Sequence, residues 1–460
     1  MIFLILAACH HSPEHHGKNI DSLEWKTMLS RGTLIAATDF NSINYFIFNG
    51  RPRGFQYELL QYFARSLNLR LVIVTPPDLS AAFEMLQNHE CDIIARNLFP
   101  LEERKKTMAF SSPILHTRQV LVQQKELPAD STLSSGEKKT VRRLADLEGT
   151  SIFVPVNSSF VSTLKKIADS ASLHFSLVEV PVGTEKLLEM VSRGDIDYTA
   201  CDELTAMAYQ DRYPNLDFSF PLTPFQYLSW GLRKSSPVLL DTLNKWIAGF
   251  KKTIDYMTIF SRYYKNTYMA AIVASEYYSV HSGKISAYDE IIKKYSKELG
   301  WDWRIIASMI YFESKFKHDA ESHKGAFGIM QLMPETARRY GVNEKSSSEA
   351  HIRAGIRILK DIYTIFSKEI RDSTEAIKFT LAAYNIGIGH IRDAQTIARK
   401  TGKNPYLWNN HVAECLLLKS KPEYYNDPDI RFGYCVGQQT VSYVNDIMDL
   451  YIHYSNAINQ

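Results

Sequence analysis

The stretch ESKFKHDAESHKGAFGIMQLMP, residues 313–334, decides the fold of the second half of the chain. A glutamate ends an apolar segment, a polar loop follows, and glycines then alternate with apolar and sulfur-containing residues before a proline. Upstream, Asp302 is a good helix N-cap, and Ile306, Ile310 and Glu313 follow at spacings of four and three residues. The spacing predicts a helix that carries the Glu313 carboxyl on its apolar face.

A carboxyl on an apolar face is a candidate general acid. Burial disfavours the charged form and raises the pKa of a carboxyl, and a place in the last helical turn adds the negative end of the helix dipole. Both effects favour a protonated Glu313, which is what the protonation of a glycosidic oxygen requires. On position alone, the alternative is a glutamate that faces solvent or pairs with Lys315 or His318.

The length and composition of the chain limit the classes of protein it can belong to. Its 460 residues are too many for one ordinary core and predict two or three domains. The formal net charge of +3 excludes a large electrostatic field toward nucleic acid, so we expect no nucleic-acid partner. The sequence contains no convincing group of metal ligands, and we expect neither a metal nor a cofactor.

The N-terminal residues 1–9, MIFLILAAC, are apolar but too few to span a membrane. We interpret them as a signal segment or a remnant of one, although the charged residues that usually open a signal peptide are missing. The LAAC sequence resembles the lipobox of bacterial lipoproteins, which implies a lipid on Cys9 and an outer-membrane lipoprotein facing the periplasm. Residues 10–32 are predicted to be a polar tether. The alternative is a buried apolar N-terminus.

Four further cysteines are divided evenly between the two halves of the chain. Cys91 and Cys201 lie beside strand-like segments and are predicted to be buried thiols. Cys415 and Cys435 are candidates for a disulfide in an oxidising compartment, a question that the sequence leaves open.

Residues 33–265 alternate strand-like and helix-like segments, which predicts an α/β domain of two lobes. The first lobe is expected to contain strands at 33–38, 70–75 and 91–96 and helices at 55–69 and 79–89. The second is expected to contain strands at 150–156, 175–180 and 196–201 and helices at 159–171 and 183–194. Two such lobes commonly hold a ligand in the cleft between them.

The segment from Gly32 to about Lys265 resembles the periplasmic solute-binding domains of family 3, the amino-acid-binding type. The matching segments are GTLIAATDF, NGRPRGFQYELLQYFARSLNL, LQNHECDIIA, LFPLEERKKTMAFSSPI and SRGDIDYTACDE. The resemblance implies that Arg104 binds the carboxylate of a ligand and that Asp202 binds its amine. A planar guanidinium forks onto a carboxylate, and a carboxylate pairs with an ammonium group.

The ligand pocket is expected to differ from that of a receptor for free amino acids. Asn97 stands where the resemblance implies a small hydroxyl residue. Ser158 and Ser159 open a predicted helix and are candidates to bind an anion. The alternative for Arg104 and Asp202 is that they are ordinary surface charges. A muropeptide or an amino-acid-like ligand is expected, and its identity stays open.

Residues 266–285 are predicted to connect the first domain to a mainly helical second domain, residues 286–460. The expected helices lie at 288–300, 302–314, 334–341, 347–367, 373–385 and 437–454. Gly300 is a helix stop signal in this pattern.

Four separated motifs in the second domain resemble the catalytic domain of lytic transglycosylases, which is related in fold to goose-type lysozyme. They are ES at Glu313, GAFGIMQLMP at 325–334, AAYNIG at 382–387 and a late tyrosine, Tyr443. The resemblance implies that Glu313 is the catalytic acid and base. It implies substrate-binding roles for Ser314, Gly325, Gly328, Met330, Gln331, Tyr384, Asn385 and Tyr443.

The resemblance also implies the reaction. Glu313 would protonate the oxygen of the β-1,4 bond between N-acetylmuramic acid and N-acetylglucosamine in peptidoglycan, and the C6 hydroxyl of the sugar would then attack C1 to give 1,6-anhydromuramic acid. A glycosidase with two carboxylates needs a second placed acid. Asp319 and Glu321 are candidates, but no pattern fixes either of them there.

Together the two halves imply a multidomain enzyme, with an α/β bilobal periplasmic-binding-protein-like domain followed by a mainly α lysozyme-like domain. The first domain is expected to regulate the second through its ligand. Two alternatives remain. One is a lysozyme-like hydrolase that uses water, and the other is a ligand- or peptidoglycan-binding lipoprotein with an inactive catalytic domain.

Overall fold

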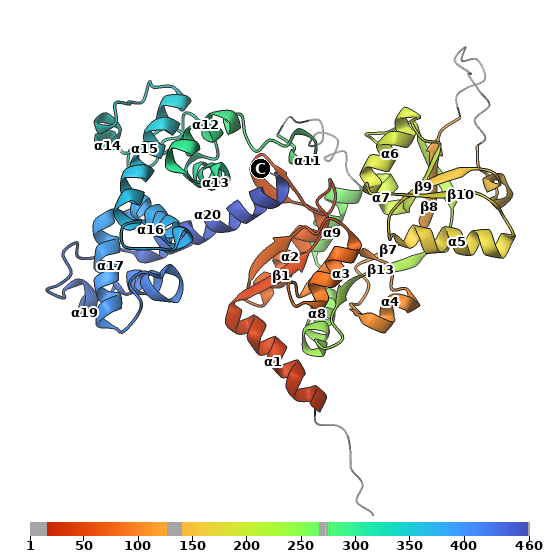
Figure 1. The fold of residues 1–460 in the computed structure, drawn as a ribbon, viewed down its shortest axis with the longest axis horizontal. Helices are drawn as coiled ribbons and strands as arrows, with labels where there is room; N and C mark the ends of the chain where they lie inside the picture. The colour runs from red at the N-terminus through yellow and green to blue at the C-terminus, as the bar shows by residue number, and fades with distance from the viewer. Residues whose placement is uncertain (1–15, 127–139, 266–271, 273–274, 276, 459–460) are drawn as a thin grey trace, which may run out of the picture. The chain divides into compact units, whose positions relative to one another are not determined.

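The computed structural model describes residues 16–126, 140–265, 272, 275 and 277–458 (Figure 1). The chain forms two compact units. One comprises the chain up to Phe46 together with Arg53–Ser275, and the other comprises Ile47–Pro52 and the chain from Glu276 onward. The predicted order of an α/β domain followed by a mainly helical domain is confirmed. Most of the predicted connection, 266–285, lies outside the described residues or in irregular structure.

The first lobe of the α/β unit is built on a six-stranded sheet in the order β4-β1-β5-β13-β6, with β7 also paired to β13. The strands β1, β4 and β5 are parallel, and β13 runs antiparallel to β5. The strands are β1 Thr33–Ala37, β4 Arg70–Val74, β5 Ile93–Leu98, β6 Ala109–Phe110, β7 Leu115–Thr117 and β13 Gln226–Leu232. The helices are α2 Phe55–Ser66, α3 Leu79–Gln87, α4 Glu102–Thr107, α8 Pro237–Phe250 and α9 Ile254–Tyr264.

The second lobe is built on a five-stranded sheet in the order β10-β9-β11-β8-β12. Its strands are β8 Gln119–Gln124, β9 Ser151–Pro155, β10 Ser176–Val180, β11 Tyr198–Asp202 and β12 Leu216–Pro221. Its helices are α5 Ser159–Ala171, α6 Thr184–Arg193, α7 Glu203–Ala208 and the short 3-10 helix η1 Leu144–Leu147. The chain passes from the first lobe to the second between β7 and β8 and returns between β12 and β13. All the strands and helices predicted for the two lobes are confirmed.

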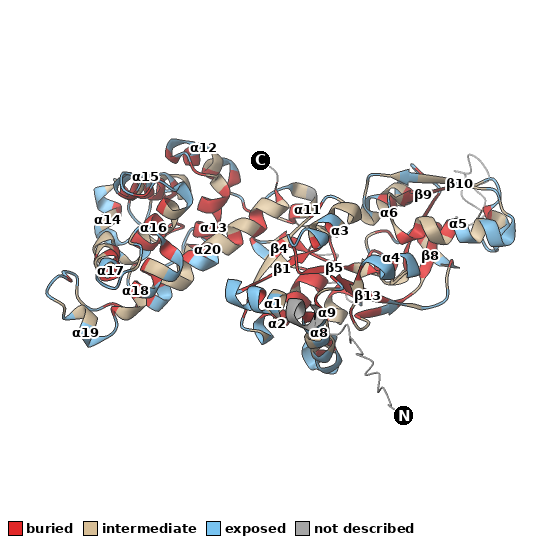
Figure 2. Cartoon of the chain, turned by 60° about the horizontal axis from the view of Figure 1, so that its bottom comes forward, coloured by how far each residue is buried: buried red, intermediate tan, exposed pale blue. Residues whose placement is uncertain are grey.

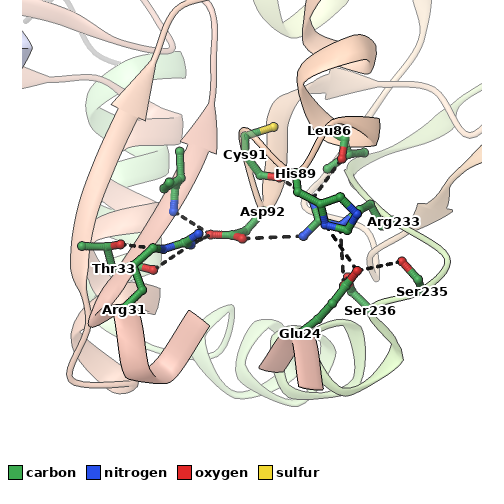
Figure 3. Close-up of polar contacts among 11 residues, drawn as sticks. Glu24, Arg31, Thr33, Leu86, His89, Cys91, Asp92, Arg233, Ser235 and Ser236 are labelled. Atoms are coloured by element: carbon green, nitrogen blue, oxygen red, sulfur yellow. Dashed lines mark hydrogen bonds and ion pairs between the residues drawn. The ribbon is translucent and has the colours of Figure 1, made fainter. Parts of the chain in front are cut away.

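The end of the predicted polar tether is helical, because helix α1 spans His16–Arg31. A charge network fastens this helix to the first lobe (Figure 3). Glu24 lies 3.5 Å from Arg233, whose guanidinium is 3.6 Å from Asp92, and Arg31 pairs with Asp92 at 2.5 Å. Since Arg233 and Asp92 are both buried, these pairs compensate charges that would be costly alone.

The helical unit is organised around α20 Gly437–Ala457, which packs against α13 Trp303–Ser314, α16 Ser373–Ile386 and α18 Ala413–Leu418. Figure 2 shows buried residues concentrated where these helices meet. The other helices are α11 Ser279–Ser282, α12 Asp289–Leu299, α14 Pro334–Arg339, α15 Ser348–Phe366, α17 Ile388–Lys400, α19 Pro422–Tyr425 and the π-helical turn η2 Trp408–Val412. The small hairpin of β2 Phe46–Phe48 and β3 Arg51–Arg53 contributes Ile47–Pro52 to this unit, where Tyr454 donates a hydrogen bond to the Gly50 carbonyl oxygen.

The helix boundaries follow the signals in the sequence. Gly300 ends α12 in the left-handed conformation that suits glycine, and Asp302 caps α13 by accepting a hydrogen bond from the Arg304 amide. Within the described residues, no helix is both long and apolar enough to cross a membrane.

The four described cysteines are all buried and unpaired. The predicted burial of Cys91 and Cys201 is confirmed. The disulfide considered for Cys415 and Cys435 is not formed in the structure.

Candidate active site

The carboxyl of Glu313 lies at the end of α13 and is the centre of the site in the helical unit. Ile310 and Ile306, one and two turns earlier on the same face, are fully buried. Burial raises the pKa of Glu313 to about 7, while the hydrogen bond from Tyr443 acts in the opposite direction. The Tyr443 hydroxyl donates to Oε1 of Glu313 at 2.5 Å. The partner of the carboxyl is thus a neutral phenol rather than Lys315.

Tyr384 and Asn385 tie α16 to the rest of the site. The Tyr384 hydroxyl donates to the carbonyl oxygen of Met330 at 2.9 Å, and burial beside Glu313 raises the pKa of this tyrosine well above its usual value. The side-chain oxygen of Asn385 accepts a hydrogen bond from Thr440 at 2.7 Å. Thr440 lies one turn before Tyr443 on α20. The hydrogen bond between Thr440 and Asn385 therefore ties the end of α16 to the part of α20 that carries the phenol partner of Glu313.

Ser314 and Gln331 have their polar groups engaged by the protein backbone. The Ser314 hydroxyl donates to the carbonyl oxygen of Ile329 at 2.8 Å and so fastens the loop after α13 to the helix. The Gln331 side-chain amide donates to the carbonyl oxygens of Ala320 and Gly328, each at 2.9 Å. Both side chains hold the loop in shape.

Met330 and Gly328 have packing roles that the sequence interpretation missed. The Met330 side chain is fully buried against Gly355, where an added Cβ would come within 2.3 Å of it. An added Cβ at Gly328 would lie 2.1 Å from the ring of His351, and its φ of +74° also favours glycine. Close approach of the His351 side chain therefore requires glycine at this position. At Gly325, by contrast, nothing lies within 4 Å of the added atom.

The loop between α13 and α14 supplies no buried second carboxyl. Asp319 and Glu321, the two candidates from the sequence, are both exposed. The structure thus brings one carboxyl, Glu313, together with two tyrosines, and this arrangement can deliver and recover a single proton.

A second site lies in the α/β unit, in a cavity of about 400 Å³ lined by both lobes. All five residues predicted to bind the regulatory ligand line it: Asn97, Arg104, Ser158, Ser159 and Asp202. The positions come from the ends of β5 and β11, from α4 and from the start of α5. The two lobes thus bring together side chains that are far apart in the sequence.

Arg104 and Asp202 present opposite charges to this cavity. The Arg104 guanidinium lies 5.7 Å from the centre of the Phe83 ring, and burial lowers its pKa. In the described part of the chain, no carboxylate lies within ion-pair distance of this guanidinium. Asp202 is buried and caps α7 by accepting hydrogen bonds from the Thr205 amide at 3.0 Å and hydroxyl at 2.7 Å. Burial raises the pKa of Asp202, and bonds from Thr205 and Asn97 oppose this rise.

Sequence reasoning missed a second arginine in the cavity. Arg96 also lines it and forms an ion pair with Asp39. Three buried polar atoms of cavity residues, Asn44 Oδ1, Arg96 Nε and Ser158 Oγ, have no hydrogen-bond partner among the described residues. Buried polar atoms are normally satisfied, so these three are suited to a polar ligand. The only signal in the sequence was an arginine at a strand end, next to Asn97.

Comparisons with known proteins match a family to each of the two units. Residues 33–266 match the model of bacterial extracellular solute-binding proteins, family 3, and residues 290–407 match the transglycosylase SLT domain. The chain is similar to a membrane-bound lytic murein transglycosylase F from Desulfosudis oleivorans, with 32% identity over 93% of this chain and 90% of that protein. A protein of the same name from Shewanella woodyi is 29% identical over 97% of this chain and 89% of its own length.

Among solved structures, an arginine-binding protein mutant from T. maritima is 23% identical with a TM-score of 0.45, covering 52% of this chain and 99% of that one. The two family matches define a solute-binding domain joined to a lytic transglycosylase domain. The chain belongs to the membrane-bound lytic murein transglycosylase F family.

The shifted pKa of Glu313 makes the stability of the enzyme depend on pH. The folded pKa of about 7 exceeds the ordinary 4.5, so the folded state holds this proton more tightly than the unfolded state. The contribution of the protonated Glu313 carboxyl to the stability of the folded state is complete below pH 4.5 and is lost as the pH rises through 7. Glu313→Gln should therefore raise the free energy of unfolding at pH 8 by about 1–2 kcal/mol and change it little at pH 4.

Urea unfolding of both proteins at the two pH values measures this difference. Tyr406→Phe, a change at an exposed tyrosine of the same unit, is the control and should show no pH-dependent difference. An equal effect of Glu313→Gln at pH 4 and pH 8 would contradict a raised pKa.

Proposed function

We propose that the chain cleaves the β-1,4 bond between N-acetylmuramic acid and N-acetylglucosamine in peptidoglycan glycan strands and leaves a 1,6-anhydro end. One observation carries the proposal: Glu313 is a partly buried carboxyl with a pKa of about 7 whose partner is the Tyr443 hydroxyl. A carboxyl with this pKa is partly protonated at neutral pH and can both give and take a proton.

The reaction requires the same carboxyl twice. Glu313 first protonates the glycosidic oxygen as the bond to C1 breaks, and the acetamido group of the substrate stabilises the positive charge that develops on the sugar. The ionised Glu313 then removes the proton of the C6 hydroxyl, whose oxygen forms the new bond to C1. The proton returns to Glu313, so the cycle consumes no water. Tyr443 stabilises the ionised carboxylate by donating its hydrogen bond.

The other residues are proposed to act in two groups. Tyr384, Asn385, Gln331 and Gly325 are proposed to border the bound sugars, and the Gln331 side-chain amide also holds the loop by its two bonds to backbone carbonyl oxygens. Ser314, Met330 and Gly328 are proposed to hold the loop and α13 in place. The Ser314 and Met330 side chains contact other parts of the protein, and a Cβ added at Gly328 would meet the His351 ring. A hydrolase that used a second carboxylate would need one beside Glu313, and the exposure of Asp319 and Glu321 favours the lytic reaction.

Digestion of purified peptidoglycan tests the reaction. The wild-type protein is expected to release muropeptides with anhydro ends, which are lighter than hydrolysis products by one water, as read by mass spectrometry. Glu313→Gln should lower the rate by at least about 100-fold, because general acid–base catalysis contributes roughly that much. Asp319→Asn is the matched control at an exposed acid and should leave the rate unchanged.

Reducing ends in place of anhydro ends would identify a hydrolase. No product from the wild-type protein, with or without muropeptides added as ligand, would favour a binding protein with an inactive catalytic domain.

We further propose that the cavity of the α/β unit binds a muropeptide or an amino-acid-like ligand and that this ligand regulates cleavage. The support is the pair of opposite charges on Arg104 and Asp202, which suits a ligand with a carboxylate and an amine. A bilobal domain whose lobes close on a ligand has the two states that regulation requires.

Arg104→Met should weaken the binding of purified muropeptides by about 10- to 100-fold, since a hydrogen-bonded charge pair contributes roughly 1.5–3 kcal/mol. Isothermal titration calorimetry on the full chain measures this affinity. Arg142→Met is the control, because Arg142 is 54% exposed and lies outside the cavity. Unchanged affinity in Arg104→Met would refute the ligand site. Demonstrated binding without any change in cleavage rate would refute the regulation.

We also propose that the protein is a lipoprotein of the outer membrane that faces the periplasm. The support is the lipobox-like sequence before Cys9, which lies outside the described residues. Labelling of cells with a fatty-acid probe should mark the wild-type protein and fail to mark Cys9→Ser. An unlabelled wild-type protein would contradict the proposal.

A further inference from the structure

The hairpin of β2 and β3 ends in a tight turn at Asn49 and Gly50. Their φ angles are +47° and +73°, the left-handed pair of a type I′ turn, which the sequence Asn-Gly favours. An added Cβ at Gly50 would lie 2.8 Å from the Tyr311 ring on α13 and 2.9 Å from the Tyr454 hydroxyl on α20. The Phe316 ring, just after α13, would be 3.0 Å away. The turn therefore fits closely against both helices.

Hydrogen bonds fasten the hairpin to the same two helices. Arg51 Nε donates to the Tyr311 hydroxyl. The Tyr454 hydroxyl donates to the Gly50 carbonyl oxygen at 3.0 Å. Ile47, at the start of the segment that belongs to the helical unit, is fully buried. The hairpin is thus an integral part of the helical unit.

The turn contacts α13 on both sides of Glu313 in the sequence. Tyr311 precedes Glu313 by two residues, so the two side chains leave the helix on opposite faces. Lys315 and Phe316, which follow the helix, have φ angles of +53° and +62°. This conformation is costly for residues other than glycine and persists only where the surroundings hold it. The Phe316 ring lies against Gly50 and Tyr311, so the hairpin helps to hold it.

Tyr454 connects the turn to the helix that carries the partner of Glu313. It follows Tyr443 on α20 by about three helical turns, so both hydroxyls leave the same face of this helix. One hydroxyl donates to Glu313 and the other to Gly50. The turn thus contacts both helices whose relative position sets the distance between the Glu313 carboxyl and the Tyr443 hydroxyl.

The chain that leads into the hairpin borders the ligand cavity of the α/β unit. Three residues of this segment line the cavity: Asn41, Ile43 and Asn44. Ser42 donates to the Glu185 carboxylate, at the start of α6 in the second lobe, from its amide at 3.2 Å and from its hydroxyl at 2.5 Å. The chain then enters the helical unit at Ile47. The segment therefore contacts the cavity and the second lobe just before it forms the hairpin.

The two chain ends of the hairpin are packed tightly against each other. Gly54 has a φ of +130°, and an added Cβ there would lie 2.2 Å from the Asn44 carbonyl oxygen. The same oxygen accepts a hydrogen bond from the Tyr57 amide at 3.1 Å, and the Gly54 amide donates to the Tyr263 hydroxyl at 2.9 Å. The cavity segment and the hairpin are therefore joined without a loose connection.

We propose that residues 41–54 form a connecting arm through which a ligand in the cavity changes the position of Glu313. When the lobes close on the ligand, the bond from Ser42 to the second lobe moves the arm, and the turn at Gly50 shifts the end of α13 relative to α20. The turn residues are positioning residues, which act through the distance between the carboxyl and the Tyr443 hydroxyl. The ligand and the reaction are those of the proposed function, on which this inference rests.

Gly50→Ala tests the positioning role. The added methyl group should displace the end of α13 and lower kcat for peptidoglycan cleavage by about 3- to 10-fold with KM unchanged. Because the Tyr443 bond lowers the pKa of Glu313, weakening it should raise the Glu313 midpoint in a carbon-13 NMR titration by about 0.5 pH unit. Gly402→Ala is the matched control, since Gly402 has a φ of +72° and nothing within 4 Å of an added Cβ. It should change neither quantity.

Tyr311→Phe tests the coupling, because it keeps the ring and removes only the hydroxyl that accepts from Arg51. Purified muropeptides should bind this full-chain variant with wild-type affinity in calorimetry, since Tyr311 does not line the cavity. The factor by which they change the cleavage rate should fall by about 2- to 10-fold. The shift that they cause in the Glu313 midpoint should fall in parallel, a readout that needs no turnover. Arg51→Met should have the same effect, and the double variant should lose no more than either single variant.

The outcomes separate the arm from the proposed function. An unchanged kcat and an unchanged Glu313 midpoint in Gly50→Ala would refute the arm. An equal response to muropeptides in the wild-type protein and in Tyr311→Phe would leave the regulation intact and refute the arm. If the Glu313 midpoint responds to muropeptides through Tyr311 but no anhydro products appear, the arm stands and the proposed reaction fails. If muropeptides do not bind the wild-type protein, the ligand site and the coupling are both refuted, and Gly50→Ala alone decides the positioning role.

Discussion

The chemistry proposed for the helical unit depends on one partly buried carboxyl beside one phenol. Desolvation of Glu313 at the end of an apolar helix face disfavours its charged form and raises its pKa to about 7. The hydrogen bond from Tyr443 limits this rise. Burial alone would make the carboxyl too weak an acid at neutral pH, and exposure would leave it permanently ionised. The balance of the two effects gives a group that can donate and accept the same proton.

The surrounding structure maintains that balance. The bond between Thr440 and Asn385 joins α20 to α16, and the bond from Tyr384 to the carbonyl of Met330 joins α16 to the loop after α13. Ser314 closes the connection from that loop back to α13. Asn385, Tyr384 and Ser314 therefore affect the proton of Glu313 indirectly, because their hydrogen bonds fix the positions of α20, α16 and the loop after α13.

The sequence predicted most of what depends on local patterns. The strands and helices of both lobes follow from alternation and periodicity, and the ends of α12 and α13 follow from Gly300 and Asp302. The place of Glu313 on an apolar face follows from the spacing of its neighbours. Helix α1 was missed because its polar sequence has no apolar stripe, and its attachment depends on a charge network with Arg233 and Asp92.

Contacts between distant residues were beyond prediction from the sequence. The ion pair of Arg96 with Asp39 and the pair of Lys419 with Asp393 both join positions that only the folded topology brings together. The contact between Gly328 and the His351 ring is of the same kind, because nothing in the sequence indicates that these two positions meet.

The central claim is that burial keeps the Glu313 carboxyl partly protonated at neutral pH. Carbon-13 NMR titration of glutamate side chains, with the Glu313 signal assigned by its loss in Glu313→Gln, measures this directly. The account predicts a midpoint near pH 7. A midpoint near the ordinary value of 4.5 would mean that the carboxyl is ionised during turnover, and the single-carboxyl mechanism would then be wrong.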